Sequence, residues 1–258
     1  MFWCQGIVIK TKPMKEADRI VVLYTKERGK LGTVAKGSRR PNNRLASLVQ
    51  PFTKGRFLLS DPTSGLKDIS QGIIIESNQD LREDLLKLAA TNYFLELVDS
   101  SVETEDPDLE VYQSLLLGLK LIKLATDLEL SLRYLEYRLL SVLGWNLQMQ
   151  NCTSCGKDLM KEDDLKFSPV QGGLTCVECR FGDEISLSVK TRAVLLSFDR
   201  LQPKALIKLK LDKKDKDELE KILRNAWDAR IEKKPKTYLF WKEVSSLENS
   251  NSGKDLQA

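Results

Sequence analysis

Apolar and polar positions alternate through residue 78, and turn residues separate the alternating runs. A period of two is typical of β-strands with one buried face. The runs predict five short strands, at 6–11, 18–25, 30–36, 52–60 and 68–77, and a short helix at 43–49. Five strands with a helix between the third and the fourth indicate a small Greek-key barrel of the OB type. An SH3-like barrel would give a similar pattern.

The spacing of apolar residues changes at residue 80 to about three and a half, which is typical of amphipathic helices. Three helices are predicted between 80 and 145, with starts at Asp80 and Glu83, at Asp106 before Pro107, and at Thr126 and Glu129. Later helices are predicted at 187–201, capped by Ser186 or Ser188, at 216–231 and at 236–244. The apolar stripes of the first three predict a helical bundle.

The predicted fold class is α+β: an N-terminal OB-type β-barrel followed by an α-helical domain with an inserted four-cysteine zinc-knuckle module. Its predicted parts are an OB domain at 1–79, a first helical part at 80–150, a Cys4 module at 151–182, a second helical part at 183–246 and a tail at 247–258. The tail is predicted to be disordered because its polar residues have nothing to bury.

Charge is unevenly distributed along the 258 residues, although the net charge is only +4. Residues 1–80 hold 14 Lys and Arg against 7 Asp and Glu, which gives +7, whereas residues 81–150 hold 6 against 12, which gives −6. The remaining residues hold 21 against 18. Separation of charge by region predicts a basic module for polyanions and an acidic module for another task.

The stretch 28–44 concentrates the positive charge, with six cations and no acid in seventeen residues. A cationic loop at the end of a strand is suited to contact a phosphate backbone, although a solvated basic loop would show the same composition. The aromatic residues available for base stacking are Trp3, Tyr24, Phe52 and Phe57. A second basic cluster, Lys204, Lys208, Lys210, Lys213 and Lys214, is predicted to be either a solvated linker or a supplementary DNA contact.

Four cysteines form two Cys-x2-Cys pairs with twenty residues between them. Two such pairs can place four thiolates around one tetrahedral zinc ion, and a shell of four cysteines is closed, so the metal would be structural. The predicted ligands of Zn2+ are Cys152, Cys155, Cys176 and Cys179. The alternatives are two disulfides, which a reducing compartment disfavours, and a redox pair, which the doubled motif disfavours. Cys4 is predicted to be a buried small hydrophobic residue.

The chain contains no histidine, which excludes Ser-His-Asp and Cys-His nucleophiles, a histidine general base and histidine-ligated catalytic zinc. An enzymatic function is therefore disfavoured. The acids between Glu103 and Glu110 offer a metal site in principle, but acids at a helix start are favoured by the dipole. The N-terminus lacks the pattern of a signal peptide and no apolar run approaches a membrane span, which predicts a cytoplasmic protein.

Five segments in fixed order resemble the start of the bacterial RecO family of recombination mediators. They are GIVIK at 6–10, EADRIV at 16–21, LYTKERGK at 23–30, AKGSRRP at 35–41 and QPF at 50–52. Residues 230–244 also resemble the closing helix of these proteins. Within the shared segments, Glu16, Asp18 and Arg19 are interpreted as turn acceptors and a local ion pair, with a metal site as the alternative.

The resemblance implies an OB domain that binds single- and double-stranded DNA and anneals complementary strands. By position, it implies that the nucleic-acid-binding residues are Lys30, Lys36, Arg39, Arg40 and Arg44. It also implies a partner, RecR, with which the protein loads RecA onto strands coated by single-strand-binding protein. The C-terminal tail of single-strand-binding protein is expected to dock on the helical part, where Arg133 and Arg138 are the available cations. Some members of the family lack the four cysteines, so zinc is not required for the mediator role.

These observations predict a non-enzymatic DNA-binding mediator of repair and recombination, cytoplasmic and associated with the nucleoid. Two other classes stay open. An RNA- or ribosome-associated binding module would also use an OB barrel and a zinc knuckle, and it would prefer structured RNA. A carboxylate-dependent nuclease would cleave DNA in the presence of Mg2+.

Overall fold

A computed structural model describes residues 1–60, 65–182 and 184–252, and side chains as far as Glu248. The chain forms two compact units, Met1–Lys123 with Pro235–Ala258, and Leu124–Lys234. We describe each unit by itself. The domain boundaries predicted from the sequence stay a prediction.

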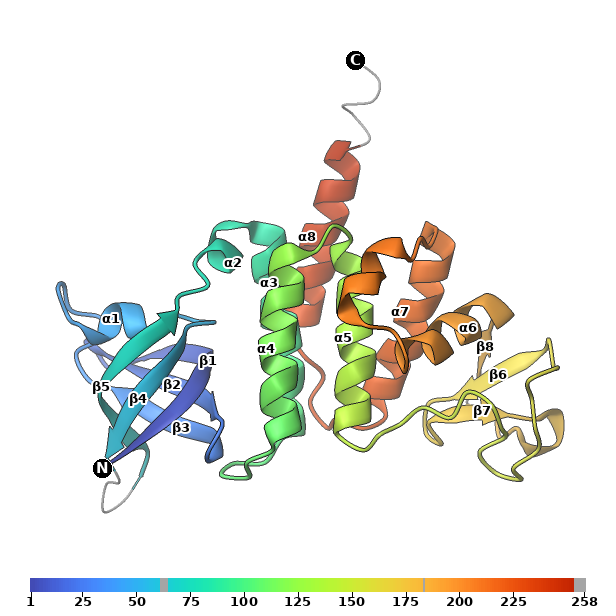
Figure 1. Ribbon diagram of the computed structural model, residues 1–258, viewed down its shortest axis with the longest axis horizontal. Coiled ribbons are helices and arrows are strands. Elements are labelled where there is room, and N and C mark those ends of the chain that lie inside the picture. Colours follow the sequence, from blue (N-terminus) through green and yellow to red (C-terminus); the bar gives the residue numbers. More distant parts are fainter. Residues whose placement is uncertain (61–64, 183, 253–258) are drawn as a thin grey trace. The chain divides into compact units, whose positions relative to one another are not determined.

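Five strands close into a barrel in the first unit (Figure 1). Their order is β1-β2-β3-β5-β4, and β1 also pairs with β4. The β3–β5 pair is parallel and the others are antiparallel. The strands are β1 (Phe2–Met14), β2 (Asp18–Thr25), β3 (Gly29–Ala35), β4 (Lys54–Ser60) and β5 (Lys67–Glu76), with α1 (Leu45–Leu48) between β3 and β4. This arrangement confirms the predicted OB-type barrel.

The interior of the barrel is filled by alternate residues of its strands, such as Phe57 and Leu59 of β4, which are fully buried. Cys4 is also buried, as predicted, and its thiol donates to the carbonyl of Phe57 over 3.7 Å. Burial raises the pKa of this thiol to about 12, so it stays protonated. β1 is longer than predicted because its first part, from Phe2 to Ile7, pairs with β4 and its second part, from Gly6 to Met14, pairs with β2. Its register against β2 shifts between Val8 and Lys10.

Four helices complete the first unit: α2 (Asp80–Glu83), α3 (Leu85–Ser101), α4 (Leu109–Leu124) and α8 (Thr237–Ser252). The predicted helix starts are displaced. Asp84 caps α3, because its Oδ1 accepts from the N–H groups of Leu86 and Lys87 at 3.0 Å each. Asp108 caps α4 in the same way. The side chains at Asp80 and Asp106 therefore do not have the capping roles predicted for them.

The last helix, α8, packs against α3 although more than a hundred residues separate them. The rings of Tyr93 and Tyr238 lie 5.4 Å apart, and Glu96 Oε2 accepts from the N–H of Thr237 at 2.8 Å. The carboxylate thus satisfies a donor at the start of α8. This helix runs to Ser252, past its predicted end at 244 and into the tail predicted to be disordered from 247. Residues 253–258 of that tail lie outside the described residues.

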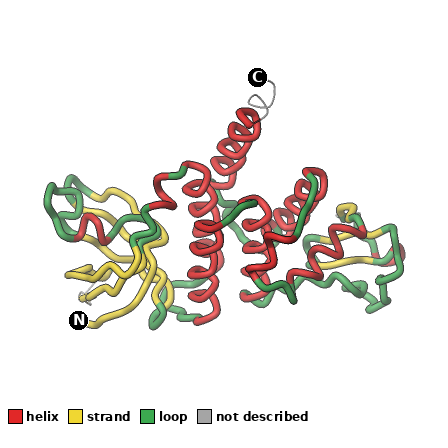
Figure 2. The backbone as a smooth tube through the Cα atoms, turned by 45° about the horizontal axis from the view of Figure 1, so that its top comes forward, coloured by secondary structure: helices red, strands yellow, loops and turns green. Residues whose placement is uncertain are grey.

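The second unit contains helices and a small sheet (Figure 2). Its elements are α5 (Leu128–Val142), β6 (Leu165–Ser168), β7 (Gly173–Thr175), η1 (Val177–Cys179), β8 (Ile185–Leu187), α6 (Val189–Phe198), η2 (Pro203–Lys208) and α7 (Lys213–Asp228). Ser188 caps α6, as predicted, whereas α5 is capped by Asp127 and α7 by Asp212. The sheet β7-β6-β8 has strands of three or four residues, too short for alternation to reveal them, and it was not predicted.

Candidate functional site

The four paired cysteines lie together in the second unit, next to the small sheet. Their Sγ atoms are all within 4.8 Å of one another, and those of Cys155 and Cys176 are 3.7 Å apart. A tetrahedral site with metal–sulfur bonds of about 2.3 Å requires sulfurs separated by about 3.8 Å. Cys152 and Cys176 are buried, while Cys155 is exposed. The four residues could therefore hold one metal ion in a closed shell of sulfur ligands.

The backbone around Cys152 favours the thiolate form of its side chain. Burial opposes the charge, but backbone N–H groups at Cys155, Cys176 and Ser154 donate to the sulfur and bring the pKa of Cys152 down to about 6. The N–H of Cys176 approaches this sulfur to 3.4 Å. Gly156 closes the first knuckle with a φ of +76° and an N–H bond of 2.9 Å to the carbonyl of Cys152. Donors aimed at the sulfur are suited to a metal-bound thiolate.

The cysteine module is attached to its neighbours by hydrogen bonds from backbone and side chain. The N–H of Thr153 donates to the carbonyl of Leu174 in β7 at 2.9 Å. Arg192 of α6 is buried and donates to the carbonyls of Leu159 and Met160 at 2.7 and 3.0 Å. The guanidinium group therefore satisfies loop carbonyls that would otherwise lack a donor. Sequence patterns did not single out Arg192, because nothing local pairs it with residues 159 and 160.

Two of the acids weighed as a metal site between Glu103 and Glu110 have structural partners. Asp108 caps α4, and Glu105 forms an ion pair of 2.5 Å with Lys67. A different acidic group, made of Glu129, Asp217 and Glu220, has carboxylate oxygens within 4.8 Å of one another in the described part of the chain. The ammonium group of Lys216 lies 4.0 Å from the carboxylate of Glu129, and the guanidinium group of Arg133 lies 3.8 Å from that of Glu220. These acids therefore belong to a network of ion pairs.

The basic loop, which we define as residues 36–44, follows β3 and precedes α1. Its backbone is fixed by hydrogen bonds. Asp18 Oδ1 accepts from the N–H of Gly37 at 2.8 Å, and the carbonyl of Ala17 accepts from the N–H of Arg39 at 2.9 Å. Gly37 has a φ of +66°, and a Cβ there would lie 2.9 Å from Asn43 Nδ2. Asp18 is thus a turn acceptor, as interpreted from the sequence.

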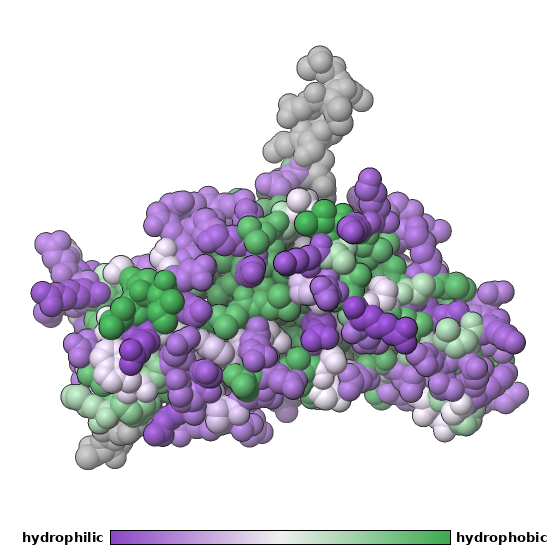
Figure 3. Space-filling view, in the orientation of Figure 1, coloured by the Kyte–Doolittle hydropathy of each residue, from purple (hydrophilic) through white to green (hydrophobic). Residues whose placement is uncertain are grey.

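The structure gathers four of the five predicted cations in this loop. Arg39, Arg40 and Arg44 are exposed, and the guanidinium group of Arg39 donates to the carbonyl of Lys15 at 3.1 Å. Lys36 forms an ion pair of 2.7 Å with Asp68, whose hydrogen bond raises the pKa of the ammonium group. Figure 3 shows strongly hydrophilic side chains at the end of the barrel beside α1.

Lys30 differs from the other four predicted cations because its side chain faces helix α3. Its ammonium group donates to the carbonyl of Asp99 at 2.7 Å and lies 3.6 Å from the Oδ1 of the same residue, and the side chain is 16% exposed. Lys10 contacts the other carboxylate oxygen of Asp99 at 2.8 Å. Asp99 and Asp68 were missed as partners because they meet the cations only through the tertiary fold.

The aromatic candidates separate into one exposed residue and three core residues. Tyr24, Phe52 and Phe57 are fully buried, whereas Trp3 is 40% exposed. The guanidinium carbon of Arg56 lies 5.3 Å from the ring centre of Trp3, and β-pairing places Ile73 opposite Arg56. A hydrophobic patch covers this part of β5 in Figure 3, where Ile73, Ile74 and Ile75 are exposed.

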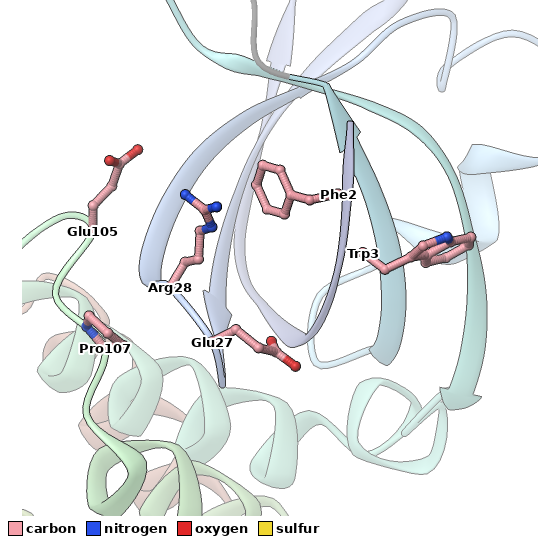
Figure 4. A pocket seen from close by; sticks show the side chains of 6 residues that line it. All are labelled: Phe2, Trp3, Glu27, Arg28, Glu105 and Pro107. Atoms are coloured by element: carbon pink, nitrogen blue, oxygen red, sulfur yellow. The ribbon is translucent and has the colours of Figure 1, made fainter.

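A hollow of about 490 Å3 lies at the end of the barrel where β1 begins (Figure 4). It is lined by Phe2, Trp3, Glu27, Arg28, Glu105 and Pro107. The side chains of Phe2 and Trp3 leave β1 in opposite directions, and the guanidinium of Arg28 lies 4.2 Å from the ring centre of Phe2. Such guanidinium–aromatic pairs are stacking surfaces for planar groups. Phe2 was not singled out from the sequence.

The two arginines considered for a docking groove have different environments. Arg133 is fully buried and pairs with Glu136 at 3.1 Å, so it is an interior ion-pair residue and the surface role considered for it is wrong. Arg138 is partly exposed. Among the helices in the described part of the chain, none is both long enough and apolar enough to cross a membrane.

Comparisons with known proteins cover nearly the whole chain. Residues 1–78 match the family described as Recombination protein O N terminal, and residues 82–239 match Recombination protein O C terminal. The DNA repair protein RecO of Bacillus pumilus is 31% identical over 253 residues, which is 97% of either chain. The protein of the same name from Desulforamulus reducens is 34% identical over 251 residues, 96% of either chain. That of Symbiobacterium thermophilum is 38% identical over 191 residues, 73% of this chain and 75% of the relative.

Proposed function

This chain belongs to the RecO family of DNA repair proteins, and we propose that it acts as a recombination mediator without enzymatic activity. In this proposal it binds single- and double-stranded DNA and anneals complementary strands. With RecR it loads RecA onto strands coated by single-strand-binding protein. Its place in the cell is then the cytoplasm, at the nucleoid.

The observation that carries the annealing activity is the basic loop. Its nine residues hold four cations and no acid, and its three arginines are exposed. Arginine presents a planar set of donors that matches phosphate oxygens. The hydrogen bonds to Asp18 and Ala17 hold the loop in one shape, so little conformational entropy is lost when DNA binds.

The mechanism follows from what these cations contact. They neutralise phosphates of a strand and leave its base edges free to pair, which lowers the repulsion between two approaching strands. Lys30 is engaged by Asp99, so we assign the contact to Lys36, Arg39, Arg40 and Arg44. Four neutralised phosphates give a slope of about −3 in a log–log plot of single-strand affinity against salt.

The test is annealing of complementary strands coated with the cognate single-strand-binding protein, with the wild type and the Arg39→Glu/Arg40→Glu variant. We expect the variant to anneal at least about ten times more slowly, because two phosphate contacts become repulsions. A control variant, Lys120→Glu/Lys221→Glu, makes the same change of net charge at exposed helical residues and should anneal at the wild-type rate.

Two results would count against this proposal. If the loop variant is folded and anneals as fast as the control, the basic loop is not the contact. If the wild type fails to anneal DNA but binds structured RNA more tightly at equal salt, an RNA-binding function replaces the mediator function. Labelled DNA should stay intact with the protein and Mg2+, since we assign no nuclease activity to the chain.

We propose that the four cysteines hold one structural Zn2+. Four sulfur donors in a closed shell are the set that this ion prefers in structural sites, and the sulfur separation of 3.7 Å fits it. Its contribution is to folding: it joins two knuckles of a module whose longest strand has four residues. Elemental analysis of the purified protein should give one zinc per chain, and a content near zero would contradict the assignment.

The partners proposed for the helical part are RecR and the tail of single-strand-binding protein. That tail needs an apolar groove with basic edges, and Arg138 remains available for such an edge because it is partly exposed. Anisotropy of a labelled tail peptide should show weaker binding to the Arg138→Glu variant than to wild type. Equal binding would remove Arg138 from the groove. RecR should co-elute with the wild-type protein in gel filtration.

A further inference from the structure

A lysine-rich segment of the second unit, residues 203–214, is unusual in its charge environment. All five of its lysines are exposed: Lys204, Lys208, Lys210, Lys213 and Lys214. Within the part of the chain that the structure describes, none of them has a carboxylate at ion-pair distance. The one acid in the segment, Asp212, caps α7 and lies 3.7 Å from the ammonium group of Lys190. The five lysines therefore keep most of their positive potential.

Other lysines nearby have acidic partners, which sets this segment apart. Lys190 contacts both Asp212 and Asp215, and Lys216 contacts Asp127 at 2.5 Å. Asp212 and Asp215 are thus paired with Lys190, and Glu218, the acid one turn after Lys214, accepts hydrogen bonds from Ser188 and Thr191. A solvated surface with no binding role commonly intersperses both signs of charge, so five exposed cations within eleven residues point to an external polyanion.

The segment is also held in place, which a solvated linker would not require. Leu206 is buried, the N–H of Ala205 donates to the carbonyl of Gln202 at 2.8 Å, and the N–H of Leu209 donates to the carbonyl of Leu206 at 3.0 Å. These bonds form η2 and fix the backbone that carries Lys204 and Lys208. The segment is therefore an ordered connection between α6 and α7.

Lys213 and Lys214 occupy the first two positions of α7, immediately after its cap Asp212. A positive charge in the first turn of a helix is unfavourable, because the N-terminal end of the helix dipole is itself positive. These two lysines therefore oppose the stability of α7.

We propose that the five lysines of residues 203–214 form a second phosphate-binding surface, which holds one DNA strand while the basic loop of the barrel holds the other. This inference rests on the proposed annealing function and adds a second strand site to it. The segment has no aromatic residue, so the contact is made by ammonium groups with backbone phosphates and is independent of base sequence. The two surfaces belong to different units of the chain. Substitutions in one surface should therefore weaken the binding of its own strand and leave the binding of the other strand unchanged.

The test compares the wild type with Lys213→Gln/Lys214→Gln and with a control, Lys221→Gln/Lys233→Gln, which removes two exposed lysines elsewhere in the same unit. Three quantities are measured: the thermal midpoint, the salt dependence of DNA binding and the annealing rate. We expect the first variant to melt at the same temperature as wild type or higher, because the dipole cost is removed. Its annealing rate should fall about tenfold. For the strand that the lysines hold, the slope of log affinity against log salt should become shallower by about 1.4, or about 0.7 for each phosphate that is no longer neutralised. The control should match wild type in all three.

The possible failures can be told apart. If wild type binds and anneals DNA and Lys213→Gln/Lys214→Gln does so equally well at the same salt slope, the second surface is absent and the basic loop alone acts. If wild type binds no DNA, the proposed function fails and this inference fails with it. Replacing Lys204, Lys208 and Lys210 as well should slow annealing further, and an unchanged rate in that fivefold variant would also overturn the inference.

Discussion

The cysteine module and the basic loop orient their functional side chains in opposite ways. In the module, four sulfurs turn toward one another within 4.8 Å, and backbone N–H groups are aimed at Cys152. In the loop, three arginines turn away from the protein and make few internal contacts. The first arrangement needs no macromolecular partner, whereas the second, in the proposed function, binds the phosphates of DNA.

This difference explains which functional residues are recognisable from sequence. The ligands of the module are defined by local spacing, since two short knuckles contain all four. The cations of the loop are defined by what the fold places beside them. Lys30 and Lys36 look alike in the sequence, yet Asp99 holds one against α3 while Asp68 leaves the other 69% exposed.

The largest effect is expected from breaking the inward-facing site with Cys176→Ser. Loss of a structural metal removes folding free energy of the order of 10 kcal/mol from the module, so residues 151–187 should become sensitive to protease and the zinc content should fall. DNA binding by the barrel should stay within about threefold of wild type, because the barrel belongs to the other unit. Limited proteolysis followed by mass spectrometry locates the cleavage. A module that stays resistant without zinc would contradict the structural role.

A smaller effect is expected when the support of the outward-facing loop is removed with Asp18→Ala. The N–H of Gly37 then loses its acceptor at 2.8 Å, which costs about 1–2 kcal/mol in the free energy of unfolding if the group stays partly buried. DNA affinity should fall about fivefold because the arginines lose their fixed backbone. Asp18→Asn keeps an acceptor oxygen and should restore most of both quantities. Equal losses in the two variants would mean that the charge of Asp18, not its hydrogen bond, is what matters.

The smallest effect is expected from Asp68→Asn, which removes the internal ion-pair partner of Lys36 in the basic loop. This change releases Lys36 from its ion pair of 2.7 Å, and an exposed pair of this kind contributes little to stability. Affinity for single strands should rise about twofold at low salt, with no change in the thermal midpoint. The gain in single-strand affinity should disappear when Asp68→Asn is combined with Lys36→Gln. A gain that persists in the double variant would show that Lys36 does not contact DNA.

The barrel and the metal ligands were predictable because their signals are local and repeated. Alternation in five runs predicted the strands of the barrel, and paired cysteines predicted the cluster that the structure shows. The predicted helix starts were less accurate, because several candidate capping residues lie close together at each start. Asp84, Asp108 and Asp127 became the caps where a neighbour had been predicted.

The remaining features could not be predicted because they depend on contacts between distant residues. Arg133 appears in the sequence as one cation on an acidic helical segment, yet it is fully buried beside Glu136 and reaches toward Glu220 on α7. Phe2 and Arg28 meet only because β1 runs past the turn between β2 and β3. The packing of α8 on α3 likewise joins residues that are far apart in the sequence, such as Tyr93 and Tyr238.

The most direct test of the central claim is the salt dependence of single-strand binding by Arg39→Gln/Arg40→Gln/Arg44→Gln, measured beside the protein with the wild-type loop. Both proteins carry Gln in place of the five lysines of residues 203–214, so that the loop is the one proposed contact that differs. If the basic loop supplies the phosphate contacts, the log–log slope should change from about −3 to about −1, since each neutralised phosphate contributes about 0.7. The variant should melt as wild type does, because the three side chains are exposed. A folded variant with the wild-type slope would show that DNA binds elsewhere and would contradict the assignment of the loop.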